Sequence, residues 1–121
     1  MKHILIVDDE KNIRQLFQEE LIDEGYQVTV ADGGRKALES IAARPPDLAI
    51  LDIRMPDITG LELMEEIRKT HPDLPIIVCT ALRALQDDFT IWESRVSAFI
   101  SKPVDLDDLK QKVKDCIGPA E

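Results

Sequence analysis

Five short apolar runs alternate along this 121-residue chain with segments in which apolar residues recur at helical spacing. The runs occupy residues 2–7, 27–31, 48–52, 76–80 and 98–101. Alternation of strand and helix is typical of an α/β protein in which helices cover both faces of an open parallel sheet. Because crossovers between parallel strands are right-handed, few topologies remain. The pattern therefore predicts one doubly wound domain over residues 1–121, a length that suits a single core.

The third run indicates strand rather than helix. It is only about as long as a strand, and Pro45 and Pro46 before it and Pro56 after it prevent a helix from continuing. The run ends on Asp52. We therefore expect a buried strand whose last residue carries a carboxylate to the edge of the sheet.

The other segments carry apolar stripes that predict amphipathic helices. Gly25 is a stop signal for the first helix, Thr59 and Glu62 form a capping box that opens the third, and Asp105 can cap the last. We expect the stripes to face the sheet. They consist of Ile13, Leu16, Phe17 and Leu21; Ala37, Leu38, Ile41 and Ala42; Leu63, Met64 and Ile67; Leu85, Phe89, Trp92 and Val96; and Leu106, Leu109, Val113 and Ile117.

Composition excludes several classes of protein. The formal net charge of -9 and the pI near 4.7 argue against direct nucleic-acid binding, which needs clustered Lys and Arg. No apolar run is long enough to span a membrane, and the acids at residues 8–10 end the first run too early for a signal peptide. Cys79 and Cys116 fit neither a metal motif nor a disulfide framework. We expect a soluble cytoplasmic protein, with both cysteines as packing residues and with His3 and His71 in solvent.

Chemically active side chains follow the predicted strands. Asp8 and Asp9 come after the first run, Asp52 and Thr80 end the third and fourth, and Lys102 follows the fifth. In open α/β sheets the functional site lies beyond the carboxyl ends of the strands, near the point where strand order reverses. We therefore expect these five residues to meet at one edge.

Three carboxylates at one edge repel one another by about 4 kcal/mol per close pair at an effective dielectric constant near 20, so they need a cation. Oxygen ligands without His or Cys favour a hard ion such as Mg²⁺. A carboxylate beside Mg²⁺ can accept a phosphoryl group, and Lys102 and the Thr80 hydroxyl can contact phosphoryl oxygens. The alternative for Asp8 and Asp9 is a helix N-terminal acid pair that the helix dipole stabilises.

Four motifs together resemble the receiver domain of two-component response regulators. They are residues 4–10, residues 51–56 running to Gly60, Thr80-Ala81, and Ser101-Lys102-Pro103. Separate motifs in the right order are far more specific than any one of them. The resemblance covers essentially the whole chain and implies a flavodoxin-like fold, with five parallel strands in the order 2-1-3-4-5.

The resemblance also implies roles for the site residues. Asp52 is the expected phosphoacceptor, the Mg²⁺ ligands are Asp8, Asp9, Asp52 and the backbone carbonyl of Arg54, and the phosphoryl group is contacted by Thr80 and Lys102. Thr80 and Phe99 are the expected switch residues. Phe99 lacks the hydroxyl that tyrosine supplies in many relatives, so it would act through packing alone, and a plain core role is equally open. The Lys102-Pro103 peptide is expected to be cis.

Partners follow from the same resemblance. The phosphodonor would be a sensor histidine kinase or a histidine phosphotransfer protein, and the output partner would bind the face made by the fourth helix, fifth strand and last helix. Part of the Phe89 and Trp92 stripe could be exposed there, and the chain could be a monomer or a phosphorylation-dependent dimer. The chain departs from the family at residues 93–98, which lack the usual Gly-Ala. Arg54 and Leu82 occupy positions at which the family tunes the lifetime of the phosphoryl group.

Three other functions compete with this non-metabolic switch, whose chemistry is limited to phosphorylation of Asp52 and slow hydrolysis. A haloacid-dehalogenase-like phosphatase needs a second Asp two residues after its nucleophile, where Arg54 stands. A flavin- or nucleotide-binding protein needs a phosphate loop after the first strand, where the acids at residues 8–10 would repel phosphate. A binding module that is independent of phosphorylation stays open.

Overall fold

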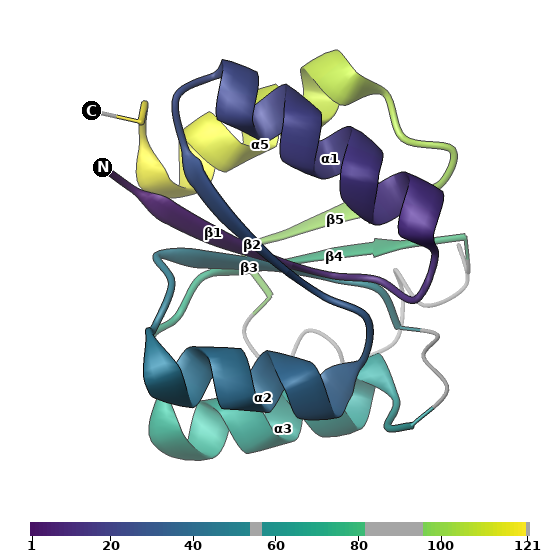
Figure 1. Ribbon diagram of the computed structural model, residues 1–121, viewed down its shortest axis with the longest axis vertical. Helices are drawn as coiled ribbons and strands as arrows, with labels where there is room; N and C mark the ends of the chain where they lie inside the picture. The colour runs from purple at the N-terminus through teal and green to yellow at the C-terminus, as the bar shows by residue number, and fades with distance from the viewer. Residues whose placement is uncertain (54–56, 82–95, 121) are drawn as a thin grey trace.

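A five-stranded sheet separates two layers of helices in the computed structural model (Figure 1). The structure describes residues 1–53, 57–81 and 96–120. All strand pairs are parallel, and the order β2-β1-β3-β4-β5 confirms the predicted doubly wound, flavodoxin-like topology. The strands are β1 (His3–Val7), β2 (Gln27–Ala31), β3 (Leu48–Leu51), β4 (Ile76–Thr80) and β5 (Ala98–Ser101).

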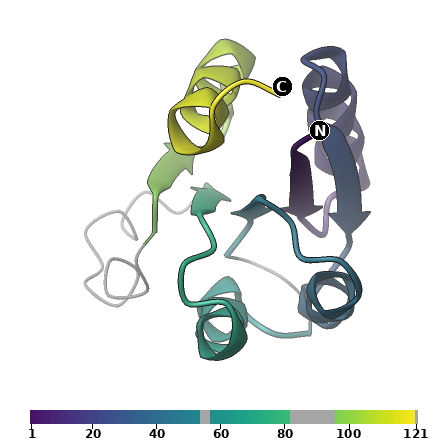
Figure 2. The ribbon, with the colours of Figure 1, turned by 90° about the vertical axis from the view of Figure 1, so that its left-hand side faces the viewer.

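Two helices cover each face of the sheet within the described ranges (Figures 1 and 2). On one face lie α1 (Lys11–Asp23) and α5 (Leu106–Ile117), and on the other lie α2 (Gly34–Ala43) and α3 (Gly60–Thr70). The predicted fourth helix with Leu85, Phe89 and Trp92 lies outside the described residues. Val96, the last member of its stripe, is buried.

Every residue of β1, β3 and β4 is buried, which explains why these strands read as unbroken apolar runs. Successive side chains point to opposite faces, so the sheet divides the core into two clusters. The cluster under α2 and α3 includes Leu5, Val7, Leu51, Leu63 and Ile67, and the cluster under α1 and α5 includes Ile4, Ile6, Phe17, Leu21 and Leu109.

The helix boundaries follow the predicted signals. Thr59 caps α3 by accepting a hydrogen bond from the Glu62 N–H at 3.1 Å, and its hydroxyl lies 3.1 Å from Glu62 Oε1. Asp105 caps α5 by accepting from the N–H groups of Asp107 and Asp108. Gly25, after α1, has a φ of 99°, a left-handed conformation that favours glycine. These caps confirm the predicted starts of α3 and α5.

Three expectations about burial are wrong. Leu16 is 39% exposed and Ala42 is exposed, because each lies at the margin of its helix's buried stripe. His3 is buried, not solvated: its backbone N–H donates to Asp47 Oδ2 at 2.8 Å, and its Nε2 lies 2.6 Å from Thr29 Oγ1. Within the described chain its Nδ1 is buried without a hydrogen-bond partner. Burial lowers the pKa of His3 below its ordinary value.

Both cysteines are free thiols that pack in the core, as expected. Cys79 is fully enclosed in β4, and burial raises the pKa of its thiol to about 12. Cys116 on α5 is half-buried, and burial raises its pKa as well. Among residues 1–53, 57–81 and 96–120, no helix is long and apolar enough to cross a membrane.

Candidate functional site

The carboxyl ends of the central strands hold the predicted site residues in place through the backbone. The Asp8 N–H donates to the Ala31 carbonyl at 3.2 Å, and the Asp52 N–H donates to the Val7 carbonyl at 3.0 Å. The Lys102 N–H donates to the Thr80 carbonyl at 2.9 Å. Because the sheet hydrogen bonding continues one residue past β1, β3 and β5, the side chains of Asp8, Asp52 and Lys102 leave the sheet from fixed points.

Four carboxylates gather at this edge. Asp8, Asp9, Glu10 and Asp52 each offer an oxygen, and these atoms all lie within 4.8 Å of one another. Asp8 and Asp52 are buried, with 2% and 5% of their surface exposed, whereas Asp9 and Glu10 are exposed. The structure therefore brings together the three acids singled out in the sequence and adds Glu10, whose proximity could have been inferred from the run of acids at residues 8–10.

Lys102 supplies positive charge to this cluster. Its Nζ lies 2.8 Å from Asp8 Oδ2, 3.3 Å from Asp52 Oδ2 and 3.4 Å from Glu10 Oε1, and its side chain is 12% exposed. Burial would lower the pKa of Lys102, but the neighbouring carboxylates of Asp8 and Asp52 raise it overall, so the ammonium stays charged. Burial raises the pKa of Asp8, and the contact with Lys102 only partly opposes this shift.

The donor set of this cluster fits a hard dication. In the described part of the chain, four carboxylates gather around the Lys102 ammonium, and every candidate ligand atom in the cluster is an oxygen. Mg²⁺ prefers carboxylate oxygens and keeps several waters, so a cluster in which two acids are buried and two are exposed suits it. Burial is the main cause of the raised pKa of Asp8, and Lys102 offsets only part of it, so a further positive charge would favour the ionised carboxylate.

A hollow of about 250 Å³ opens at the same edge. It is lined by Asp9, Glu10, Asp52, Thr80, Ala81 and Lys102, so the nucleophile, hydroxyl and ammonium of the predicted site share one space. Thr80, the last residue of β4, is only 1% exposed. Phe99 on β5 is half-buried and packs against the cluster under α2 and α3.

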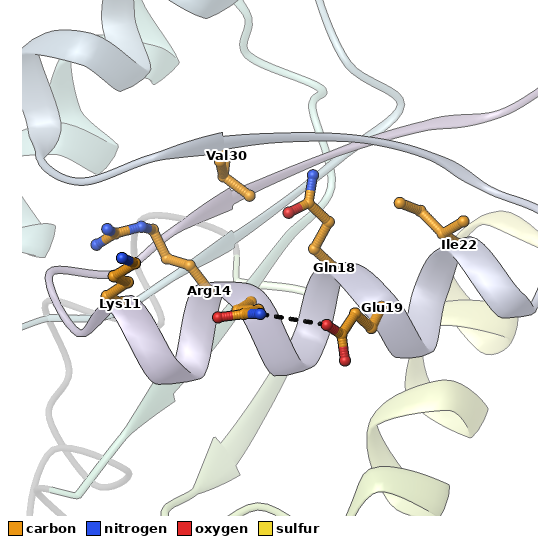
Figure 3. Close-up of a pocket in the computed structure, with 7 residues that line it drawn as sticks. Lys11, Arg14, Gln18, Glu19, Ile22 and Val30 are labelled. Carbon is orange, nitrogen blue, oxygen red and sulfur yellow. Dashed lines mark hydrogen bonds between the residues drawn. The ribbon is translucent and has the colours of Figure 1, made fainter.

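A wider hollow of about 600 Å³ lies between α1 and β2 (Figure 3). None of the strand-end residues lines it; its walls are Lys11, Arg14, Gln15, Gln18, Glu19, Ile22 and Val30. These residues mix apolar and polar side chains and include one carboxylate, Glu19, so they do not form a cluster of acids like the one at the strand ends. The smaller hollow is therefore the better candidate for a functional site.

The other predicted features are a cis peptide bond before Pro103 and the family-specific positions at residues 54, 82 and 93–98. The Lys102-Pro103 peptide bond is cis. Arg54, Leu82 and residues 93–95 lie outside the described part of the chain.

Asp57 caps helix α2, a role that was not predicted from the sequence. Its carboxylate accepts hydrogen bonds from the N–H groups of Gly34 at 3.1 Å, Arg35 at 3.0 Å and Ile58 at 2.8 Å. These donors, Arg35 first, hold the pKa of Asp57 at about 2. A signal existed in the sequence: α2 starts at Gly33-Gly34, which has no side chain of its own to cap a helix.

The family of the chain follows from comparison with known proteins. The model of the response regulator receiver domain matches residues 4–114, and the chain belongs to this family. It is 36% identical over 115 residues to the transcriptional regulatory protein GlrR of Escherichia coli, a match that covers 95% of this chain and 26% of GlrR. The chain thus spans about a quarter of the length of that curated relative.

Solved receiver structures share the fold closely. Response regulator TrrA from Thermotoga maritima, in complex with Mg²⁺-BeF, is 45% identical with a TM-score of 0.89, covering 96% of this chain and 99% of TrrA. A CheY-like receiver domain protein from Methanospirillum hungatei is 35% identical with a TM-score of 0.90, covering 95% of this chain and 92% of that one. These neighbours bear out the fold and the receiver class that the sequence motifs indicated.

Proposed function

We propose that residues 1–121 form one receiver domain in which Asp52 accepts a phosphoryl group in a Mg²⁺-dependent reaction. The observation that carries this proposal is the position of Asp52. Asp52 directly follows the central strand β3, and its carboxylate lies 3.3 Å from Lys102 Nζ and belongs to an acid cluster that suits a dication. TrrA, which is similar over nearly its whole length, was solved with Mg²⁺-BeF, and this supports the assignment of the metal.

The chemistry is a transfer onto a carboxylate. An Asp52 oxygen attacks phosphorus, the bond from phosphorus to the donor breaks, and an aspartyl phosphate forms. Bound Mg²⁺, held by Asp8, Asp9, Asp52 and the Arg54 carbonyl, would supply positive charge for the transferring group. Lys102, already within 3.3 Å of the Asp52 carboxylate, provides a second positive charge for a phosphoryl oxygen there.

Thr80 and Phe99 are the residues through which the modification would reach the surface. Thr80 ends β4 and lines the hollow beside Asp52, so its hydroxyl can meet another phosphoryl oxygen. Phe99 lies opposite Val78 in the register between β4 and β5. Because Phe99 packs on the core and has no hydroxyl, we propose that it responds to a shift of β4 through packing.

The partners follow from this role. The donor is a sensor histidine kinase or a histidine phosphotransfer protein, and the chain acts as a binding switch, not as a metabolic enzyme. The output partner, or a second phosphorylated copy, binds the face that includes β5 and α5. The net charge of -9 argues against nucleic acid as a directly bound partner.

The test is phosphorylation from a small donor. The protein is incubated with Mg²⁺ and acetyl phosphate and its intact mass is measured, alongside Asp52→Ala, a chelated sample and Asp23→Ala. Asp23 is an exposed acid at the end of α1 and serves as the matched control. We expect one phosphoryl group on the wild type and on Asp23→Ala, and none on Asp52→Ala or without metal. Absence of an adduct, when a known receiver is labelled, would favour a binding module that is independent of phosphorylation.

A further inference from the structure

Helix α2 is capped by a distant segment of the chain. Its N-cap residue, Gly33, has no side chain, and the first N–H groups of the helix are instead satisfied by Asp57. The Asp57 carboxylate accepts from Gly34 at 3.1 Å and from Arg35 at 3.0 Å, across 23 and 22 residues of sequence. A carboxylate at a helix N-terminus is further stabilised by the helix dipole. The connection between β3 and α3 is thereby tied to the start of α2.

The glycine pair makes room for this contact. A Cβ on Gly33 would lie 2.9 Å from Asp57 Oδ1, and a Cβ on Gly34 would overlap the side chain of Ile58. Both glycines are buried. The absence of side chains at these two positions therefore lets residues 57 and 58 lie directly against the helix.

The other end of the same connection is fixed to the strand that carries Asp52. The Gly60 N–H donates to the Ile53 carbonyl at 2.8 Å. A Cβ on Gly60 would lie 2.6 Å from Ile53 Cα and 2.7 Å from the Asp52 carbonyl oxygen. The start of α3 thus rests on the backbone of Asp52 and Ile53, with no space between them for a side chain.

We propose that Asp57 is a positioning residue for the metal site: by tying residues 57–60 to α2, it fixes the contact of Gly60 with the backbone of Asp52 and Ile53 and so orients Asp52 for Mg²⁺. This inference rests on the function proposed above. Asp52 belongs to the proposed ligand set, and its backbone carbonyl lies directly against Gly60. The orientation of Asp52 therefore depends on how residues 57–60 are anchored. Residues that orient metal ligands typically change metal affinity by about 10- to 100-fold when mutated.

The first experiment measures Mg²⁺ affinity by isothermal titration calorimetry on the whole chain. We expect the dissociation constant for Mg²⁺ to rise about tenfold in Asp57→Ala, near the lower end of such effects. Asp57→Asn should lie between the wild type and Asp57→Ala, because its amide oxygen can still accept one of the two helix N–H groups.

The matched control for charge is Asp32→Asn. Asp32 is an exposed acid just before α2 that pairs with Lys36 at 3.4 Å, so this variant loses the same charge near the same helix without touching the tether. Its Mg²⁺ dissociation constant should stay within about twofold of the wild type, since the charge is exposed and screened. An equal rise in Asp32→Asn and Asp57→Asn would reduce the effect to general electrostatics and overturn the proposal.

Gly34→Ala tests the tether without a change in charge. Alanine ordinarily favours helix over glycine, so a purely helical effect would leave metal binding intact or improve it. We instead expect weaker Mg²⁺ binding, because the new Cβ displaces Ile58 and with it Asp57. In both Gly34→Ala and Asp57→Ala, the Mg²⁺ concentration that half-saturates phosphorylation should rise, while the rate at saturating Mg²⁺ stays close to that of the wild type.

The two proposals fail in different ways. If the wild type itself binds no Mg²⁺ and accepts no phosphoryl group, the proposed function is wrong. If the wild type binds Mg²⁺ and the folded Asp57 and Gly34 variants bind it equally well, Asp57 is only a helix cap. Circular dichroism and urea unfolding identify a variant that does not fold, and Asp57→Asn, the mildest change, then decides the matter.

Discussion

Strand β1 has a buried ionisable side chain at each end: His3 at its start and Asp8 just after its last residue. Both are nearly inaccessible, with 6% and 2% of their surface exposed. At the amino end, His3 is kept neutral and contacts the Thr29 hydroxyl. At the carboxyl end, Asp8 faces further carboxylates and one lysine. The same strand therefore holds a neutral side chain at one end and a concentration of charge at the other.

The difference shows which end is suited to a ligand. At the amino end, His3 is neutral and already contacts Thr29, so a bound ion would have little charge to neutralise there. At the carboxyl end the acids outnumber the ammonium, so a cation can lower the free energy of the folded state. The following predictions test this contrast, from the largest expected effect to the smallest.

Removing Lys102 should have the largest effect on stability. In Lys102→Ala without metal, the buried acids Asp8 and Asp52 lose their nearest cation, and we expect a loss of about 3 kcal/mol in the free energy of unfolding. Urea denaturation at neutral pH measures it. Lys114→Ala, which breaks an exposed pair with Glu24, should cost less than about 1 kcal/mol. Equal losses in the two variants would contradict the idea of a charged, buried cluster.

Mg²⁺ should stabilise the folded protein through the carboxyl end alone. At a concentration about 100 times its dissociation constant, the ion should add about 2.7 kcal/mol to the free energy of unfolding. Thermal melts with MgCl₂, compared with NaCl at equal ionic strength, measure this gain. Asp8→Asn should lose most of it, whereas a change at the amino end, such as His3→Gln, should retain it. A gain that survives in Asp8→Asn would place the ion elsewhere.

Thr29→Val should weaken the amino end by a smaller amount. The substitution removes the hydroxyl 2.6 Å from His3 Nε2 and leaves a buried ring nitrogen without that partner. We expect a loss of about 1 kcal/mol in the free energy of unfolding, measured with urea. Thr70→Val is the matched control, because Thr70 makes a similar contact with His71 Nδ1 in an exposed position. No difference between the two would mean that burial adds nothing to the His3 contact.

Acidification should act on the two ends in opposite directions. The pKa of His3 lies below its ordinary value of 6.5, mainly through burial and then through Arg44. Below pH 6.5 the unfolded chain therefore binds more protons than the folded chain, and the contribution of His3 to stability decreases as the pH is lowered. Burial outweighs Lys102 and raises the pKa of Asp8 above 3.8, its value in the unfolded chain. Between the unfolded and folded pKa values the folded chain therefore binds more protons, and stability rises as the pH is lowered.

Urea unfolding of metal-free protein over a pH series separates these contributions. Relative to the wild type, His3→Gln should lose the decline with acid, and Asp8→Asn should lose the gain. Identical pH profiles for all three proteins would contradict both assignments.

The fold and most of the site could be predicted because both depend on local patterns. The apolar runs identified the strands, and a parallel sheet necessarily gathers the residues that follow them at one edge. That rule alone was enough to bring Asp8, Asp52 and Lys102 together. Helix caps such as Thr59 and Asp105 were predictable for the same reason, since their partners lie within three residues.

Two of the failures, His3 and Asp57, concern contacts between segments that are far apart in the sequence. His3 looked like a polar residue before a strand, but its burial depends on Thr29 in β2 and on Asp47 before β3. Asp57 looked like an ordinary turn residue, because the helix that it caps starts 23 residues earlier. Ala42 follows Ile41 by one residue, a rotation of about 100° that takes it off the buried face of α2.

The buried thiol of Cys79 allows conformational opening of this chain to be measured by its rate of alkylation. With its pKa at about 12, the sulfur remains protonated at ordinary working pH, and iodoacetamide can reach it only when the core under α1 and α5 opens. Cys116, half-buried on α5, should be alkylated through fraying of that helix alone. The ratio of the two labelling rates would therefore distinguish sub-global opening of this core from local fraying of α5, without any engineered probe.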